Sequence, residues 1–419
     1  MIRRFFDILI PSSSGTRFLA LIMVIVAVFL ACEFPAHLQD QISTNGGGGD
    51  PPVYLHLAND LRHGLYSHTM NTCFPPGYPL ILALMPAPIN YTSAILLSAL
   101  LALASIPLVY LLVKKHVGSS AALLSSACWT FVVLISHDYF LRPMTEPLFI
   151  VACLVLFLVQ KPIAKGFLSG FLPLIRPEGI LLIFAGALGT KPWRSRFAVL
   201  VIALALNLPY LCFVHDISGR WQWSAKNSFN QQVSPYVIAG TWVATQKLEK
   251  MQGLPMPLTA YPHRPLPTFP PPTDPRVIQT LGMDLARKAQ LYESPISRIF
   301  VNLRRCWERS DHPIFLAFLG FLGLIPLARK RNPLLLPIFS LIPLGLLWLP
   351  YFFGRERFML LLLLSAALSA AGILFAYQLW PMHHIGEIQR RRRTGFINSD
   401  SAVIIAQPTH HKARQVVDA

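Results

Sequence analysis

Long apolar runs alternate with short polar segments along the first 379 residues. A helix that crosses the hydrocarbon layer, which is about 30 Å thick, needs roughly 20 apolar residues. The pattern therefore predicts an all-α polytopic membrane protein. The uninterrupted runs predict spans at residues 17–33, 91–113, 121–136, 147–160, 197–214, 313–327, 333–353 and 358–379.

A further apolar run, residues 166–190, is interrupted by Arg176-Pro177-Glu178. A single span would bury two charges at mid-depth, which is costly. Two short spans that meet at this tripeptide would place it at the membrane surface, and the prediction then reaches about ten spans. The apolar piece at residues 78–88 is too short to cross.

Clusters of lysine and arginine follow many of the apolar runs. Placing every cluster in the cytoplasm agrees with the positive-inside rule and puts both chain ends on that side. The first run could also be a signal peptide; we prefer an uncleaved span, because the later spans continue the same topology. The clusters are Lys114-Lys115, Lys161 with Lys165, Lys191 with Arg194 and Arg196, Arg329 to Arg331, and Arg390 to Arg393.

This topology predicts a transmembrane domain over residues 1–379 and a basic, disordered cytoplasmic tail over residues 380–419. The domain includes two large external segments, residues 34–92 and 215–312. A helix is expected from Pro51 to about His63, since proline suits a helix start. Residues 274–309 regain helical character and predict an interfacial helix. Its expected lipid-facing residues are Ile299, Val301, Leu303 and Trp307, and its headgroup-facing residues are Arg298, Arg304, Arg305 and Arg309.

Composition supports this class. Of 419 residues, 53% are hydrophobic and 13% are charged, whereas soluble domains carry about 25% charged residues. The net charge of +17 could indicate nucleic acid, but the basic residues lie between apolar runs. We therefore interpret Arg390 to Arg393 as an anchor near anionic lipid rather than an RNA-binding tail. A disulfide between the predicted external residues Cys73 and Cys306 stays open.

Polar residues of the predicted outer side are the candidates for chemistry. Asp50 follows four glycines and precedes two prolines. Its carboxylate could remove a proton from an attacking hydroxyl, or it could cap the helix that starts at Pro51. Both roles are compatible with one another.

Arginine and glutamate recur at the predicted outer ends of three membrane spans. Arg142 and Glu146 stand one helical turn apart and could form a structural pair, or Arg142 could bind a phosphate bidentately. The outer ends of the other two spans carry Arg176 with Glu178, and Arg355 with Glu356 and Arg357. His56 and His63 share a helix face, but their spacing gives only a weak indication of metal binding.

Several of these motifs resemble the GT-C glycosyltransferases, the polyprenyl-phosphate-sugar enzymes related to lipid A aminoarabinose transferase and protein O-mannosyltransferases. Residues Asp50 to Ala58 and Phe74-Pro75-Pro76-Gly77-Tyr78-Pro79-Leu80 are similar to the first external loop of that family. The scattered motifs keep the family order. The others are Thr145-Glu146-Pro147-Leu148, Arg176-Pro177-Glu178-Gly179, Glu293 to Trp307, and Arg355-Glu356-Arg357-Phe358.

The resemblance implies an inverting sugar transfer from a polyprenyl-phosphate donor to a lipid, glycan or protein acceptor, with Asp50 as general base. It implies that Arg142, Arg355 or Arg357 stabilises the leaving phosphate. Tyr54 and Tyr78 would line the pocket, and Glu146, Arg176 and Glu178 belong to the same candidate set. It further implies a bacterial inner membrane, and the predicted topology puts the active site on the outer face.

One departure concerns metal binding. Pro51 stands where several relatives have a second carboxylate. We therefore assign no metal ligand and no certain cofactor, and leave a divalent metal open.

Two other functions compete with this one. A transporter or lipid flippase usually places charges or broken helices near mid-membrane, often in paired repeats. Here the charges lie at one face, and we find no repeat of fixed period. A scaffold protein would not need Asp50 beside a row of arginines. No nucleic-acid partner is expected.

Overall fold

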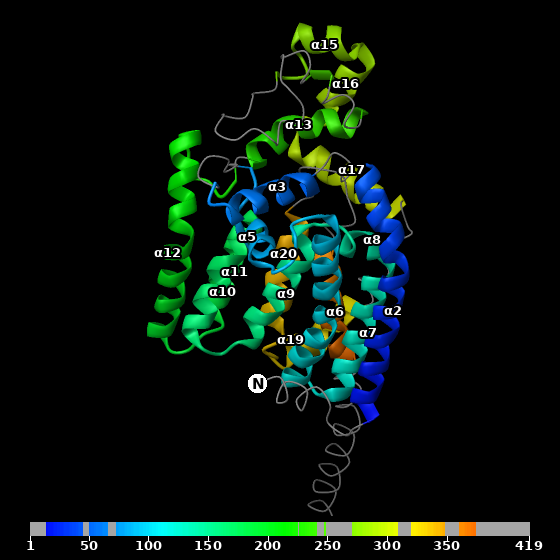
Figure 1. The fold of residues 1–419 in the computed structure, drawn as a ribbon, viewed down its shortest axis with the longest axis vertical. Coiled ribbons are helices and arrows are strands. Elements are labelled where there is room, and N and C mark those ends of the chain that lie inside the picture. The colour runs from blue at the N-terminus through cyan, green and yellow to red at the C-terminus, as the bar shows by residue number, and fades with distance from the viewer. Residues whose placement is uncertain are drawn as a thin grey trace, which may run out of the picture. The chain divides into compact units, whose positions relative to one another are not determined.

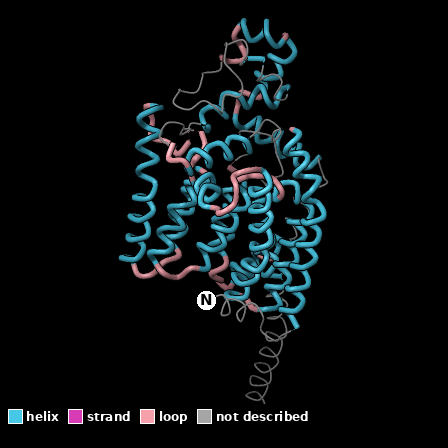
Figure 2. The backbone as a smooth tube through the Cα atoms, in the orientation of Figure 1, coloured by secondary structure: helices cyan, strands magenta, loops and turns pink. Residues whose placement is uncertain are grey.

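The computed structural model describes residues 14–44, 50–65, 73–224, 226–240, 247–248, 270–308, 320–347 and 360–373. Within these residues the ordered elements are helices joined by short loops, without a strand (Figure 2). The all-α prediction is confirmed for this part of the chain. Arg355, Glu356, Arg357 and the predicted tail at residues 380–419 lie outside it.

Three described helices are long and apolar enough to cross a membrane. They are α2 (Ser14–Ser43), α6 (Tyr91–His116) and α12 (Trp193–Ser218). Large apolar side chains remain exposed along them, such as Val24 and Val28 on α2 and Leu208 on α12. An apolar surface of this kind fits lipid better than water and indicates a membrane protein.

The other apolar helices are shorter than the predicted spans. At 1.5 Å per residue, the 14 residues of α10 reach about 21 Å, less than the hydrocarbon layer. Ten complete crossings are therefore not confirmed. The shorter helices are α7 (Ser119–Ile135), α9 (Thr145–Leu158), α10 (Pro162–Ile175), α11 (Ile180–Leu188), α19 (Leu324–Arg329), α20 (Leu335–Leu346) and Leu360–Ile373.

The first span was predicted to end at residue 33, but the helix that contains it does not end there. Helix α2 continues through Pro35 to Ser43. The prediction followed hydropathy, which drops after Cys32, whereas the helix continues with polar residues. This extension brings Glu33 and His37 beside the end of α7.

The predicted break at Arg176 is confirmed. Helix α10 ends at Ile175, a short 3₁₀ turn, η2, covers Pro177–Gly179, and α11 follows. Proline disfavours helical backbone in the residue before it, and Arg176 is extended, with φ −147° and ψ 133°. The two arms, α10 and α11, pack against each other and against α12 (Figure 1).

Basic side chains close helix carboxyl ends at one end of the bundle. Lys115 Nζ donates to Leu158 O of α9 at 3.3 Å, and Lys165 Nζ donates to Gly189 O after α11 at 2.7 Å. Such contacts satisfy orphan carbonyls and oppose the negative end of the helix dipole. The predicted basic clusters of residues 114–115 and 161–165 therefore share one end of the helices.

Two short helices lie in the first predicted external segment. They are α3 (Asp50–Arg62) and α5 (Gly77–Leu84), and they pack against each other. The expected helix after residue 50 is thus confirmed. Cys73, just before α5, is buried, and the side chain of Cys306 lies outside the described residues.

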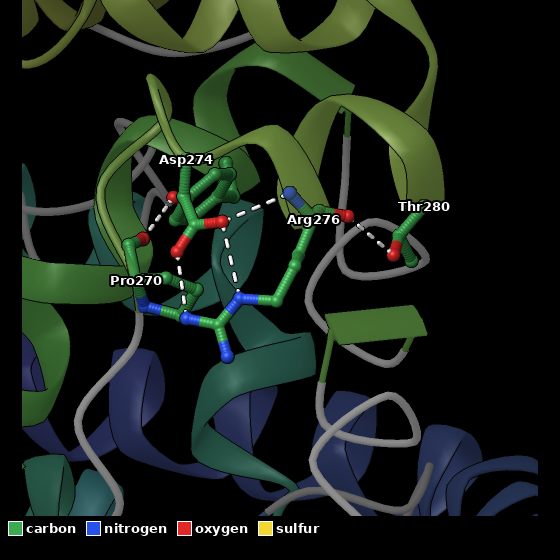
Figure 3. Close-up of polar contacts among 5 residues, drawn as sticks. Pro270, Asp274, Arg276 and Thr280 are labelled. Carbon is green, nitrogen blue, oxygen red and sulfur yellow. Dashed lines mark hydrogen bonds and ion pairs between the residues drawn. The ribbon is translucent and has the colours of Figure 1, made fainter.

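The second predicted external segment is also helical where it is described. It contains α13 (Lys226–Gly240), α15 (Pro275–Leu281), α16 (Met283–Leu291) and α17 (Pro295–Glu308). Asp274 caps α15 by accepting from Arg276 N at 2.8 Å, and its carboxylate also meets the Arg276 guanidinium (Figure 3). These hydrogen bonds hold the pKa of Asp274 below its usual value.

The predicted faces of α17 are wrong in part. Arg298 was expected at lipid headgroups, but it is 4% exposed and donates to Tyr292 O and Glu293 O beyond α16. Among the α17 side chains that the structure describes, Ile296 and Phe300 are the strongly exposed apolar ones, at 66% and 69%, while Ile299 and Val301 are half-buried. The side chains of Leu303 and Trp307 lie outside the described residues. Capping of α16 therefore decides which side of α17 faces inward.

Candidate functional site

Asp50 begins α3 and is partly exposed, with Pro51 and Pro52 in the first turn. Proline fits there because the first amide protons of a helix have no partner inside it. The amino end of the helix dipole stabilises a negative charge. A helix start and a presented carboxylate are both consistent with this position.

Arg62 fixes the other end of α3 against α5. Its guanidinium donates to Ala83 O at 3.1 Å, Ala87 O at 3.0 Å and Met85 O at 2.7 Å. These are carbonyls at and just beyond the carboxyl end of α5, which would otherwise lack partners. Arg62 is therefore a structural residue that joins α3 to α5.

Tyr54 and Tyr78 connect α3 to the interior of the bundle. Their rings meet edge to face with centroids 5.1 Å apart, and Tyr54 packs in the same way on Phe74 at 5.2 Å. Tyr78 is fully buried, close to Ser98 of α6 and near Glu146. Burial raises the pKa of the Tyr78 hydroxyl, so this group stays protonated and neutral.

The α10–α11 turn carries a buried ionic cluster. Arg176 Nη1 lies 2.7 Å from Glu146 Oε1, and Arg176 Nε lies 2.6 Å from Glu178 Oε1. The three side chains are 9%, 7% and 6% exposed. Arg176 also donates to Thr145 Oγ1 at 3.4 Å and lies over the Phe149 ring. We call these three charged residues the Arg176 cluster.

The Arg176 cluster ties the start of α9 to the break between α10 and α11. Two carboxylates face one guanidinium, and buried charges of this kind require such pairing. In this conformation Arg176 contacts protein carboxylates from both sides. Its first effect is thus to position Glu146 and Glu178.

Arg142 does not pair with Glu146, contrary to the pairing that their spacing suggested. Helix α9 begins at Thr145, so Arg142 lies in the preceding turn, where helical spacing does not apply. Glu146 takes Arg176, from a distant segment, as its partner. Arg142 Nε is buried without a hydrogen-bond partner, and the salt bridges formed by the described residues do not include Arg142.

The histidines singled out by the sequence have local partners. Exposed His56 lies 3.3 Å from Asp60, and His63 Nδ1 lies 2.8 Å from Asn59 O. The sequence reasoning missed His37. The extension of α2 brings Glu33 and His37 to His137, which is the first residue of α8 (His137–Phe140). The spacing of four residues between Glu33 and His37 was the available signal, because it puts both on one helix face.

The predicted site residues therefore fall into three groups. Tyr54, Tyr78, Glu146, Arg176 and Glu178 form a contiguous, buried set, while Asp50 begins α3 and Arg142 lies in the turn before α9. Arg355 and Arg357 belong to the residues that the structure does not describe. Comparison of the chain with protein-family models, with curated proteins and with solved structures finds no match.

Proposed function

We propose that this protein is a multi-pass membrane glycosyltransferase of the GT-C type. One observation carries the proposal: polar residues from four separate segments lie near helix ends, at residues 50, 78, 142–146 and 176–178. These ends are opposite to the helix ends that Lys115 and Lys165 close. Polar groups are expensive in a membrane, and their collection at one end suggests a site.

In the proposed reaction, the acceptor hydroxyl oxygen attacks the anomeric carbon of the sugar. The bond between that carbon and the phosphate oxygen breaks, and the polyprenyl phosphate leaves with the electron pair. Asp50 takes the proton of the attacking hydroxyl. Attack opposite to the leaving group inverts the anomeric centre.

Arg142 is the proposed partner of the leaving phosphate. Negative charge grows on that phosphate in the transition state, and a fixed guanidinium stabilises it. The absence of an ion pair between Arg142 and Glu146 supports this role, because the guanidinium is not committed to that carboxylate. The Arg176 cluster and the two tyrosines would hold the surrounding helices in place.

The apolar helices would accommodate the polyprenyl chain in the plane of the membrane. With the basic end in the cytoplasm, Asp50 and Arg142 face outward, as in a bacterial inner membrane. The acceptor would be a lipid, a glycan or a protein of the cell envelope. The proposed proton transfer uses a protein carboxylate.

Asp50→Asn tests the proposal in proteoliposomes that contain a polyprenyl-phosphate sugar. General-base catalysis contributes about 10²–10⁴-fold, so transfer should fall by at least that lower bound. Mass spectrometry of lipid-linked sugars and surface glycans, with and without the protein, identifies the donor and product. Asp284→Asn, at an exposed position of α16, is the matched control and should keep full turnover.

Retained turnover in Asp50→Asn would remove Asp50 as the base. Movement of the lipid-linked sugar across the bilayer without a glycosidic product would instead establish the transporter or flippase alternative.

A further inference from the structure

Glu33, His37 and His137 bring three potential metal ligands together from two separate segments. One ligand atom from each of them lies within 4.8 Å of the other two. The side chains of His37 and His137 are 13% and 26% exposed, so both are largely shielded. Polar groups on an apolar helix usually face the interior and pair with one another.

The geometry of His137 prepares it for metal binding. Its Nδ1 lies 2.8 Å from Leu134 O, and because a carbonyl only accepts, Nδ1 is the donor. This leaves the lone pair on Nε2. Metal-bound histidines commonly use such a hydrogen bond to fix the tautomer and the ring orientation. Phe29 packs edge-on against the same ring at 5.2 Å and further limits its rotation.

Charges of both signs lie beside the cluster, because the Arg142 guanidinium is near His37 and the Asp138 carboxylate is near both histidines. Asp138 Oδ1 lies 3.2 Å from His37 Nε2 and 3.6 Å from His137 Nε2. A carboxylate beside two imidazole nitrogens supplies negative charge where a metal would sit. The rings of His37 and His137 meet edge to face with centroids 5.5 Å apart, so both nitrogens are held near one point.

We propose that Glu33, His37 and His137 form a Zn²⁺ site with an open fourth position. Two imidazoles and one carboxylate are a ligand set typical of catalytic zinc, with water or a substrate oxygen as fourth ligand. Mg²⁺ and Ca²⁺ prefer oxygen ligands throughout. Tetrahedral zinc would need ligand atoms about 3.3–3.5 Å apart. The ligand atoms of the three residues lie within 4.8 Å of one another, and small side-chain rotations would bring them to the shorter separation.

Bound zinc would join the extension of α2 to the α7–α8 junction, five residues before Arg142. The site does not depend on glycosyl transfer. Its binding is therefore measured on the full chain without any sugar donor.

The test uses the full chain in detergent with an affinity tag that contains no histidine. After incubation with Zn²⁺ and gel filtration, elemental analysis should find one equivalent of zinc per chain, and X-ray absorption should show two imidazoles and no sulfur. His37→Ala and His137→Ala should each weaken zinc binding by at least about tenfold. Glu33→Gln should also weaken it while keeping the size of the side chain.

Matched controls separate this site from other histidines. His56→Ala, at an exposed position of α3, should bind zinc like the wild type. A variant with His383, His384, His410 and His411 replaced by alanine should do the same. Zinc loss in the tail variant, wild-type binding by both His37→Ala and His137→Ala, or wild-type binding by Glu33→Gln would overturn the site. Displacement of zinc by equimolar Mn²⁺ would overturn the choice of metal.

Discussion

Three arginines at the same end of the helices perform different physical tasks. Arg62 closes the carboxyl end of α5 with hydrogen bonds to carbonyls. Arg176 is buried between two carboxylates. Arg142 forms no ion pair with Glu146 and has a buried Nε without a hydrogen-bond partner. Only the last arrangement leaves a guanidinium for an anionic ligand, so the partners of each arginine decide its role.

Replacement of Arg176 by leucine should strongly destabilise the protein. The change leaves Glu146 and Glu178 buried without their shared cation, and breaking a buried pair in this way costs about 3–5 kcal/mol. Thermal unfolding in detergent should show a clear fall of the midpoint. Because Arg176 joins α9 to the α10–α11 turn, proteolysis in this turn should also become faster.

A triple variant supplies the control for that experiment. Glu146→Gln and Glu178→Gln in the Arg176→Leu background remove both uncompensated charges and should recover much of the lost stability. Equal unfolding midpoints for Arg176→Leu and the wild type would show that the cluster is not needed for the fold.

The sequence could predict which residues are polar and at which helix ends they lie, but not their partners. Arg176 was correctly placed at a break between two helices, because a continuous membrane helix would have to bury two charges and accommodate a proline inside the apolar run. Its pairing with Glu146 could not be predicted, because the two residues are 30 positions apart. His37 was missed because α2 was expected to end four residues earlier.

At the scale of elements, local sequence signals predicted where helices lie, and contacts between helices set the direction in which each helix face points. The helix after Asp50 was predicted from proline placement, and the structure contains it. Residues 274–309 were predicted to be helical and to form an interfacial helix, whereas the structure divides residues 275–308 among three helices, α15, α16 and α17. The orientation of α17 was not predictable in this way. Arg298 turns inward because it satisfies carbonyls that follow α16, which is a contact between helices.

Gly77 explains why the motif before Tyr78 contains glycine. An added Cβ would lie 2.6 Å from Leu174 O and 2.8 Å from Ile175 N, both backbone atoms of α10. Helix α5 can therefore approach the turn that carries Arg176 only without a side chain at this position. Tyr78, the next residue, depends on the same close packing for its burial.

Gly77→Ala should force α5 away from α10. Overpacking of this kind typically costs about 1–3 kcal/mol, so the unfolding midpoint should fall. The proposed glycosyl transfer should fall with it because Tyr54 and Tyr78 move. Leu84→Ala is the matched control, since Leu84 is on the same helix and 72% exposed. Indistinguishable melting of the two variants would contradict the close contact.

At the scale of the whole bundle, the two ends of the helices carry different charged residues. One end carries Lys115 and Lys165 on helix carbonyls, and Arg196 Nε donates to Thr190 O at 2.8 Å in the same region. The other end carries α3, α5 and the Arg176 cluster. Cytoplasmic loops are enriched in lysine and arginine, so the candidate site should face outward.

Single cysteines at the two ends test this orientation in intact cells. In a background without the native cysteines, Asn59→Cys on exposed α3 should react with a membrane-impermeant maleimide. Arg194→Cys, at an exposed position near the start of α12, should react only after the cells are permeabilised. Both side chains are exposed, so a difference in labelling reports the side of the membrane rather than burial. The reverse pattern would put Asp50 in the cytoplasm, and the proposed acceptors of the cell envelope would then have to be abandoned.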